Sequence, residues 1–220
     1  MSCRQGSNIK KWQFDKDAAE NFALIAQREI PDYRRVIDLS IRICKRLEIE
    51  NPKIIDVGSA IGTTLHALHE AGLENLYGVD SSAEMLARSF DQATLIQSEQ
   101  FPLEHGPFDV VIANWVLHFI QDRVAYLKDI TESLSPNGVL ILTEKVSGSA
   151  LANELYYDFK RANGVTEAEI ELKKQRLEGV LTTYPLSWYL NTLEKLGFEQ
   201  IDIVNANTVF VTLLASRTGN

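Results

Sequence analysis

The sequence has 220 residues, of which 45% are hydrophobic, and a formal net charge of −8 at pH 7. A chain of this size can bury a substantial core and fits one domain. Its net negative charge repels the phosphate backbone of nucleic acids, which argues against general nucleic-acid binding. Cys3 and Cys44 supply neither a disulfide framework nor metal-ligand spacing, and no secretory signal or membrane-spanning stretch is visible. We expect a cytoplasmic protein with no metal, no direct nucleic-acid partner and no membrane contact.

Two helices are predicted before the first strand. Apolar residues recur at helical spacing over 14–28, and a second amphipathic pattern follows Pro31 and runs over 33–47. Because these helices precede the sheet, we expect residues 12–49 to form a helical cover that can fold over its ligand-binding end.

The middle of the chain alternates strand and helix patterns. Strands are predicted at 53–58, 75–79, 93–97, 108–113 and 138–143, with helices at 63–71, 82–90 and 120–134. This alternation predicts a doubly wound, mostly parallel α/β sheet with helices on both faces. Ligands of such sheets bind beyond the carboxyl ends of the strands, so candidate site residues are sought there.

The pattern changes after Glu144. Three helices are predicted at 148–162, 166–179 and 185–196. We expect the region 148–196 to be a helical insertion that meets the substrate. It is rich in tyrosine and basic residues, most of them expected on solvated helix faces, with a minority able to converge on an anionic substrate. Two strands, 198–204 and 208–215, are predicted to pair as an antiparallel hairpin through a loop at 205–207.

The first predicted strand runs into a glycine-containing loop, Asp56-Val57-Gly58-Ser59-Ala60-Ile61-Gly62, and then directly into a helix. Glycine permits left-handed backbone and close approach to a ligand, and the N–H groups at a helix N-terminus can face that ligand. The strict dinucleotide pattern is absent because the glycines are four positions apart. An ordinary strand-to-helix turn is therefore an alternative interpretation.

Asp80 ends the second predicted strand, about 20 residues beyond the glycine loop, where an acidic residue can accept both hydroxyls of an adenosine ribose. The alternative is a structural role at the start of the next helix, where Ser81 and Glu84 have the spacing of a capping box. The two roles are compatible. Together the loop and Asp80 favour an adenosine-containing ligand.

Polar residues also follow later strands. Glu99 can face the adenine, or it is a solvated loop acid. Asn114 and Trp115 can hold and cover a polar group of a ligand, or they are a turn asparagine and a core tryptophan. His118 is the nearest candidate for a base, but a lone histidine in an apolar stretch is more often packed, and we favour that interpretation.

These features resemble the class I S-adenosylmethionine (SAM)-dependent methyltransferases, whose first loop is usually acidic-x-Gly-x-Gly-x-Gly. Asp56, Gly58 and Gly62 match that loop, and Ala60 replaces its middle glycine. Residues 134–138 resemble the family's turn before the fifth strand, and the closing hairpin distinguishes this fold from nicotinamide dehydrogenases. The resemblance covers 1–220 as one SAM-binding domain and implies a seven-stranded Rossmann-like sheet with a C-terminal antiparallel hairpin.

A narrower resemblance is to the carboxy-SAM synthase branch of that family. The segments that carry it are Trp12-x-Phe14-Asp15, Thr143-Glu144-Lys145 and Asp158-Phe159-Lys160-Arg161-Ala162-Asn163-Gly164, followed by Glu167, Glu169 and Ile170. Enzymes of this branch take a carboxyl group from prephenate and place it on the methyl group of SAM. The resemblance also implies a homodimer.

The resemblance assigns site roles to matching positions. For the methionine end of SAM, it implies that Tyr33 meets the methionine part and that Asn114 lies near the sulfonium. For the adenosine end, it implies that Asp80 and Ser81 hold the ribose and that Glu99 lies by the adenine. The loop residues that it implies for the SAM site are Asp56, Gly58, Ser59 and Gly62.

One position departs from the narrower family. An arginine of its late helix pairs with the new carboxylate across the dimer interface, and this chain has Lys174 there. Arginine binds a carboxylate with a planar fork, whereas lysine offers a compact charge, so the exchange is not conservative. The candidate catalytic residues are therefore Asn114, Tyr33 and Lys174.

Three functions remain open from the sequence. The leading hypothesis is a SAM-dependent methyltransferase acting on a small molecule with an acidic or aromatic part. The alternative is a carboxy-SAM synthase-like enzyme that converts SAM and prephenate to carboxy-SAM and phenylpyruvate. A third is a SAM-binding regulator without turnover.

Overall fold

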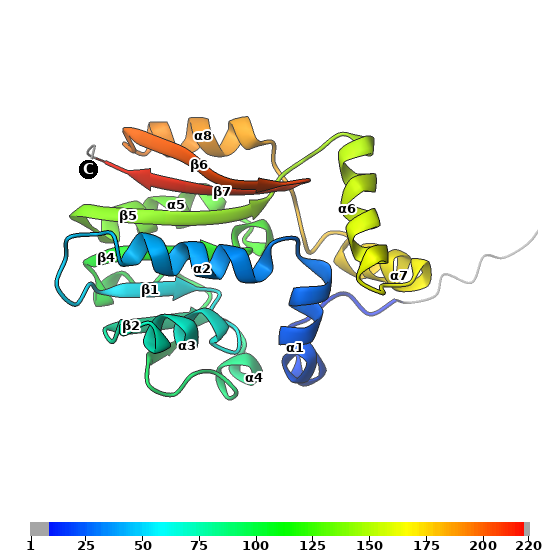
Figure 1. Cartoon of the computed structure of the whole chain (residues 1–220), viewed down its shortest axis with the longest axis horizontal. Helices are drawn as coiled ribbons and strands as arrows, with labels where there is room; N and C mark the ends of the chain where they lie inside the picture. Colours follow the sequence, from blue (N-terminus) through cyan, green and yellow to red (C-terminus); the bar gives the residue numbers. More distant parts are fainter. Residues whose placement is uncertain (1–8, 218–220) are drawn as a thin grey trace, which may run out of the picture.

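The computed structural model describes residues 9–217, and within them the strands form one sheet in the order β3-β2-β1-β4-β5-β7-β6 (Figure 1). The first five strands of the sheet, β3, β2, β1, β4 and β5, are parallel to one another. Strand β7 pairs antiparallel with both β5 and β6. The predicted doubly wound sheet with a C-terminal antiparallel hairpin is confirmed. The strands are β1 (Ile54–Val57), β2 (Leu76–Asp80), β3 (Thr94–Gln97), β4 (Phe108–Asn114), β5 (Leu134–Lys145), β6 (Gln200–Asn207) and β7 (Phe210–Ser216).

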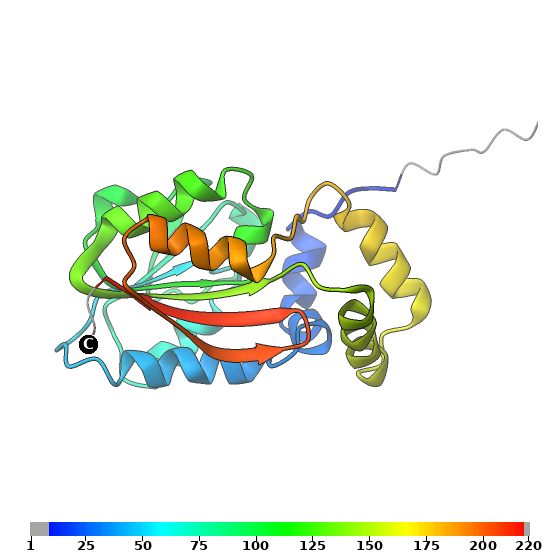
Figure 2. The ribbon, with the colours of Figure 1, turned by 90° about the horizontal axis from the view of Figure 1, so that it is seen from above.

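Helices cover both faces of this sheet, and three more lie beyond its end (Figure 2). The helices α2 and α3 pack on one face, and α5 and α8 on the other. The helices α1, α6 and α7 lie past the carboxyl ends of the parallel strands. The helices are α1 (Lys16–Glu29), α2 (Tyr33–Cys44), α3 (Thr63–Glu70), α4 (Ala83–Leu86), α5 (Arg123–Ser133), α6 (Ala150–Ala162), α7 (Glu167–Leu177) and α8 (Leu186–Lys195), with 3₁₀ turns η1 (Leu103–His105) and η2 (Leu117–Phe119).

The central strands are buried on both faces. All residues of β1 and nearly all of β4 are buried, including the alternate positions that a half-exposed strand would leave to solvent. This burial pattern is typical of a parallel strand between two helical layers, because each face packs against helices. The layers hold the strand ends, and hence the loops that follow them, in fixed positions.

The two N-terminal helices take different places. Helix α1 lies beyond the strand ends and begins at Asp15, whose side chain accepts the backbone N–H of Ala18. Helix α2 instead runs along one face of the sheet beside α3. Its Cys44 packs there in an apolar cluster with residues of α3 and of the central strands. Only the first of the two predicted helices therefore lies over the strand ends.

Several boundaries differ from the sequence expectations. Helix α4 is a single turn whose N-cap is Ser82, which accepts the N–H of Met85, so the predicted capping box at Ser81 is wrong. Strand β5 begins at Leu134, because that residue pairs with Phe108 before a register shift. Residues 205–207 belong to β6, and the hairpin turn is 208–209.

No helix within residues 9–217 combines the length and apolar character needed to cross a membrane.

Candidate functional site

A cavity of about 710 Å³ opens where the parallel strands end. Its wall contains most of the residues that the sequence singled out, although they come from five separate segments. Those in the wall are Tyr33, Asp56, Gly58, Ser59, Asp80, Ser81, Glu99 and Asn114. Of these, Ser81 and Glu99 are exposed at the rim, whereas Tyr33, Asp56, Ser59 and Asn114 are buried. Gly62 and Lys174 do not line this cavity.

The glycine loop is bound to the neighbouring strand. The N–H groups of Gly58 and Ser59 donate to the carbonyl of Val79 at 2.8 and 3.1 Å. Gly58 and Ala60 both have left-handed backbone, with φ of 66° and 48°. An alanine in this conformation costs about 1 kcal/mol relative to glycine, and the N–H of Ala60 donates to Asp80 at 2.9 Å. The loop thus keeps its shape without the family's middle glycine.

Gly62 serves the packing of the loop rather than the cavity wall. It is the N-cap of α3, with φ of 73°. A Cβ atom there would lie 2.6 Å from the backbone nitrogen of Phe90 and 2.5 Å from Ser89 Oγ. Only glycine fits, because the start of α3 lies directly against the segment that follows α4.

Two carboxyl groups lie side by side under the loop. Asp80 accepts the N–H groups of Ala60 and Ser82, each at 2.9 Å, and burial raises its pKa. Burial, and then the negative charge of Asp80, raise the pKa of Asp56 to about 8, while a hydrogen bond from Thr64 opposes that rise. A carboxylate has about four acceptor positions, so Asp80 keeps capacity for the hydroxyls of a ligand.

Asn114 is fixed by the strand beside it. Its Oδ1 accepts the hydroxyl of Thr143 at 2.5 Å, and its Nδ2 lies 3.5 Å from Ser40 Oγ. The next residue, Trp115, has φ of 58°, and its ring centroid lies 4.9 Å from that of Tyr33. The structure therefore brings Asn114 and Tyr33 to the same wall, joined through Trp115.

Basic residues form the far wall of the cavity. A second cavity of about 290 Å³ shares with the first the side chains of Lys145, Tyr156, Lys160, Lys173, Leu177 and Leu181. Lys174 lines only this second cavity, and its side chain is 38% exposed beside Glu171. Sequence reasoning singled out Lys174 and missed Lys145. The abundance of tyrosine and lysine in the predicted helices indicated a basic substrate region. The packing of α6 and α7 near the end of β5 decides which of these lysines line the cavity.

Two of these lysines are enclosed without a carboxylate partner. Lys145 Nζ lies 4.5 Å from the ring centroid of Tyr156, and Lys173 Nζ lies 3.2 Å from that of Trp12. Burial first, and then the positive charges of Lys160 and Lys174, lower the pKa of Lys145 to about 8. Burial also lowers the pKa of Lys173 to about 8, although the negative charge of Glu29 opposes that change. Among residues 9–217, only Lys160 of this enclosed group has an ion pair, with Glu29 at 2.8 Å.

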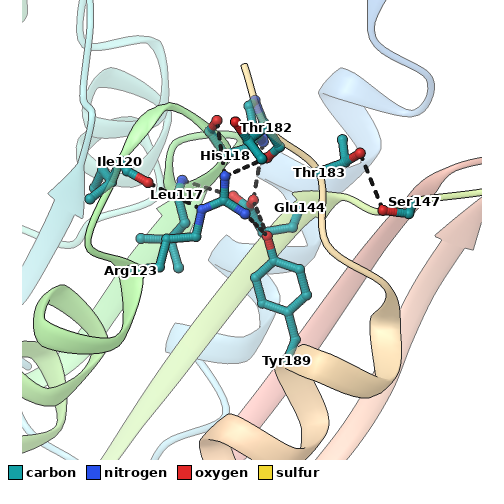
Figure 3. Close-up of polar contacts among 9 residues, drawn as sticks. All are labelled: Leu117, His118, Ile120, Arg123, Glu144, Ser147, Thr182, Thr183 and Tyr189. Atoms are coloured by element: carbon teal, nitrogen blue, oxygen red, sulfur yellow. Dashed lines mark hydrogen bonds and ion pairs between the residues drawn. The ribbon is translucent and has the colours of Figure 1, made fainter. Parts of the chain in front are cut away.

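A buried polar network lies behind the cavity, where β5 ends (Figure 3). Glu144 contacts His118 and Tyr189, and Arg123 donates to Tyr189 and to the carbonyls of His118 and Thr182. Of these residues His118 also lines the cavity. No local sequence pattern joins Arg123 and Tyr189 to Glu144, because these residues come from α5, α8 and β5.

The residues present fit SAM. Asp80 lines the cavity and keeps acceptor capacity for the hydroxyls of a ligand, and Gly58 and Ser59 of the glycine loop lie in the same wall. Asp80 would hold the ribose hydroxyls, Tyr33 and the glycine loop the methionine part, and Asn114 would lie near the sulfonium. Bound SAM would supply an activated methyl group.

Comparison with known proteins identifies the family of this chain. Residues 55–142 match a methyltransferase domain family. The chain is 30% identical to a carboxy-S-adenosyl-L-methionine synthase of Nautilia profundicola, over 94% of each chain. It is 31% identical to a carboxy-S-adenosyl-L-methionine synthase of Photorhabdus laumondii, over 95% of this chain and 90% of that one.

A solved structure shows the same fold. The magnesium protoporphyrin IX methyltransferase of Synechocystis PCC 6803, with bound SAH, matches with a TM-score of 0.66 at 15% identity, over 93% of this chain and 96% of that one. The sequence relatives show that this chain is a SAM-dependent transferase. It belongs to the class I SAM-dependent methyltransferases, on the branch that contains the carboxy-SAM synthases.

Proposed function

We propose that this transferase acts on a small molecule that carries a carboxylate. The observation that carries the proposal is the pair Lys145 and Lys173, two half-buried lysines that line the wall shared by the two cavities. Among residues 9–217 neither forms an ion pair, whereas the neighbouring Lys160 does. A buried charge is expected to be paired, and a carboxylate of the second substrate would supply the missing partner. The pair lies across the cavity from the glycine loop.

Methyl transfer to such a substrate needs mainly alignment. The methyl group passes in line from sulfur to the acceptor, so the enzyme contributes by holding both molecules and excluding water. Tyr33 and Asn114 would fix the SAM side, and Lys145 and Lys173 the acceptor side. In this proposal Lys174 contributes less than either enclosed lysine, because it is more exposed and already lies beside Glu171.

Carboxy-SAM formation is the second candidate. It is favoured by the names of the curated relatives and by the match at Thr143-Glu144-Lys145 and residues 158–164. In that reaction the lysines would hold the carboxylates of prephenate and of the product. The expected homodimer belongs to this candidate, since it comes from the same resemblance.

The test incubates the purified protein with SAM and either prephenate or a panel of aromatic and aliphatic carboxylic acids. Mass spectrometry then looks for carboxy-SAM with phenylpyruvate, or for S-adenosylhomocysteine with a methylated acid. Small molecules released from the freshly purified protein on denaturation are identified first, because a retained ligand names the substrate class directly.

Lysine variants separate the roles. We expect Lys145→Met and Lys173→Met to weaken binding of the carboxylate substrate about tenfold or more while the Kd for SAM stays within about twofold. Lys174→Met is the matched control and should change both affinities little. Equal losses for SAM and the acid in the Lys145 and Lys173 variants would contradict the proposal, as would turnover of neutral acceptors only.

A further inference from the structure

The polar network behind the cavity defines the state of His118. Glu144 is 2% exposed, and its Oε1 accepts the backbone N–H of Leu117 at 2.9 Å. Its Oε2 accepts the hydroxyl of Tyr189 at 2.9 Å and lies 3.1 Å from His118 Nδ1. The Tyr189 oxygen itself accepts from Arg123 Nη1 at 3.2 Å. Leu117 and Tyr189 thus each donate to one oxygen of the Glu144 carboxyl group.

This arrangement assigns the proton on the imidazole. A carboxylate that only accepts hydrogen bonds requires a proton on His118 Nδ1. In a neutral ring the other nitrogen, Nε2, then carries a lone pair. No partner for Nε2 exists among residues 9–217. A carboxylate behind an imidazole both orients the ring and stabilises it after it accepts a proton.

His118 belongs to the cavity as well as to the network. It is 4% exposed, it lines the cavity together with Asn114 and Phe119, and it lies on η2, directly after the strand that carries Asn114. Its backbone carbonyl accepts from Arg123 and from the N–H of Thr182, so the main chain at this residue is held from two sides. The ring therefore contacts the Glu144 carboxyl group on one side and belongs to the cavity wall on the other.

We propose that His118 Nε2 accepts the proton that the second substrate releases during methyl transfer, with Glu144 as its positioning residue; this inference rests on the proposed function. When the acceptor is a hydroxyl or an amine, its lone pair forms the new bond to the methyl carbon. The carbon–sulfur bond breaks with its electrons passing to sulfur, and the acceptor proton moves to Nε2 and later to solvent. The cavity lysines are assigned to the substrate carboxylate in the proposed function, which leaves the proton to His118.

The first experiment measures the tautomer without needing turnover. Imidazole ¹⁵N resonances are recorded for the full chain, free and with S-adenosylhomocysteine as the probe, and His118→Gln assigns the signals. We expect the proton on Nδ1, and an Nε2 resonance that moves when the probe binds. A proton on Nε2, or an Nε2 resonance that the probe leaves unchanged, would overturn the proposal even if the enzyme turns over.

The second experiment is kinetic. We expect His118→Gln to lower kcat roughly 100-fold or more, with the KM for SAM within about twofold, while His66→Gln, on an exposed side chain of α3, retains the wild-type rate. Added imidazoles should restore the rate of His118→Ala in the order of their basicity. Rescue that follows the size of the imidazole, or an unchanged kcat in His118→Gln, would overturn the proposal.

The results of these experiments distinguish an error in the role of His118 from an error in the proposed function. Wild-type protein that transfers no one-carbon group to any carboxylate refutes the proposed function, and the tautomer result still decides for or against His118. Glu144→Gln adds a check on positioning, because it should reduce the fraction of rings protonated on Nδ1 and lower kcat together. If this variant does not fold, Tyr189→Phe removes one donor to Glu144 with the ring retained and should produce a smaller change of the same kind.

Discussion

Lys160 Nζ lies 2.8 Å from Glu29 Oε2, so a nearly buried ion pair joins α6 to α1 in the wall of the cavity. The two side chains are 5% and 12% exposed, and they are 131 positions apart in the sequence. The pair therefore connects the N-terminal helix to the helical insertion, the two parts of the chain that lie beyond the strand ends.

Removing Glu29 should destabilise the protein. Glu29→Gln leaves the Lys160 ammonium group buried without its carboxylate, and breaking a buried pair costs about 3 kcal/mol. Glu20→Gln is the matched control, because it breaks the exposed ion pair with Arg88 and should cost less than about 1 kcal/mol. Denaturant unfolding measures both. Similar values for the two variants would mean that the pair between α1 and α6 is screened by water.

Asp80 should determine the affinity for SAM. Asp80→Asn weakens the acceptor for the ribose and loses one backbone contact, at Ala60 or Ser82. We expect the Kd for SAM to rise roughly tenfold to a hundredfold, since each 1.4 kcal/mol is about a factor of ten. Calorimetry measures the change, with Asp91→Asn as an exposed control. An unaltered Kd would remove the ribose role.

Asp56 should make stability depend on pH. Its folded pKa is about 8, above the value of 3.8 for a free carboxyl, so the folded state retains a proton that the unfolded state releases. The stability from this group is present at low pH and is lost as pH rises toward and through 8. Asp56→Asn cannot ionise, so its unfolding free energy relative to wild type should rise from pH 5 to pH 8. A constant difference over that range would contradict the raised pKa.

Binding of a carboxylate should weaken in alkaline solution. The pKa values of Lys145 and Lys173 are about 8, so both are ammonium groups below that pH and lose their charge above it. Affinity for an acidic substrate should therefore be highest below pH 8 and fall above it, with protons taken up on binding near pH 8.5. Calorimetry in two buffers of different ionisation enthalpy measures the uptake. The Lys145→Met/Lys173→Met double variant should show neither effect, and persistence of the uptake in it would place the titrating group elsewhere.

The order of strands and helices was readable from the sequence because each element carries its own local pattern. The buried run of β4, the glycine turn after β1 and the acidic end of β2 each depend on neighbours within a few residues. Together they predicted the fold and several residues that line the cavity. Details that depend on pairing were missed: the early start of β5 comes from its contact with Phe108, and the place of the hairpin turn from the register of β6 against β7.

The sequence by itself thus determined the sheet, the cavity residues Asp80 and Asn114, and the presence of many lysines after β5. Only the tertiary structure decided that Lys145 and Lys173 are enclosed, that Lys174 remains more exposed, and that His118 meets Glu144. Burial and pKa depend on what other segments bring to a side chain, whereas the sequence pattern around a residue reports only its own helix or strand. The fold therefore followed from local periodicity, and the chemistry of the substrate side followed from contacts between distant segments.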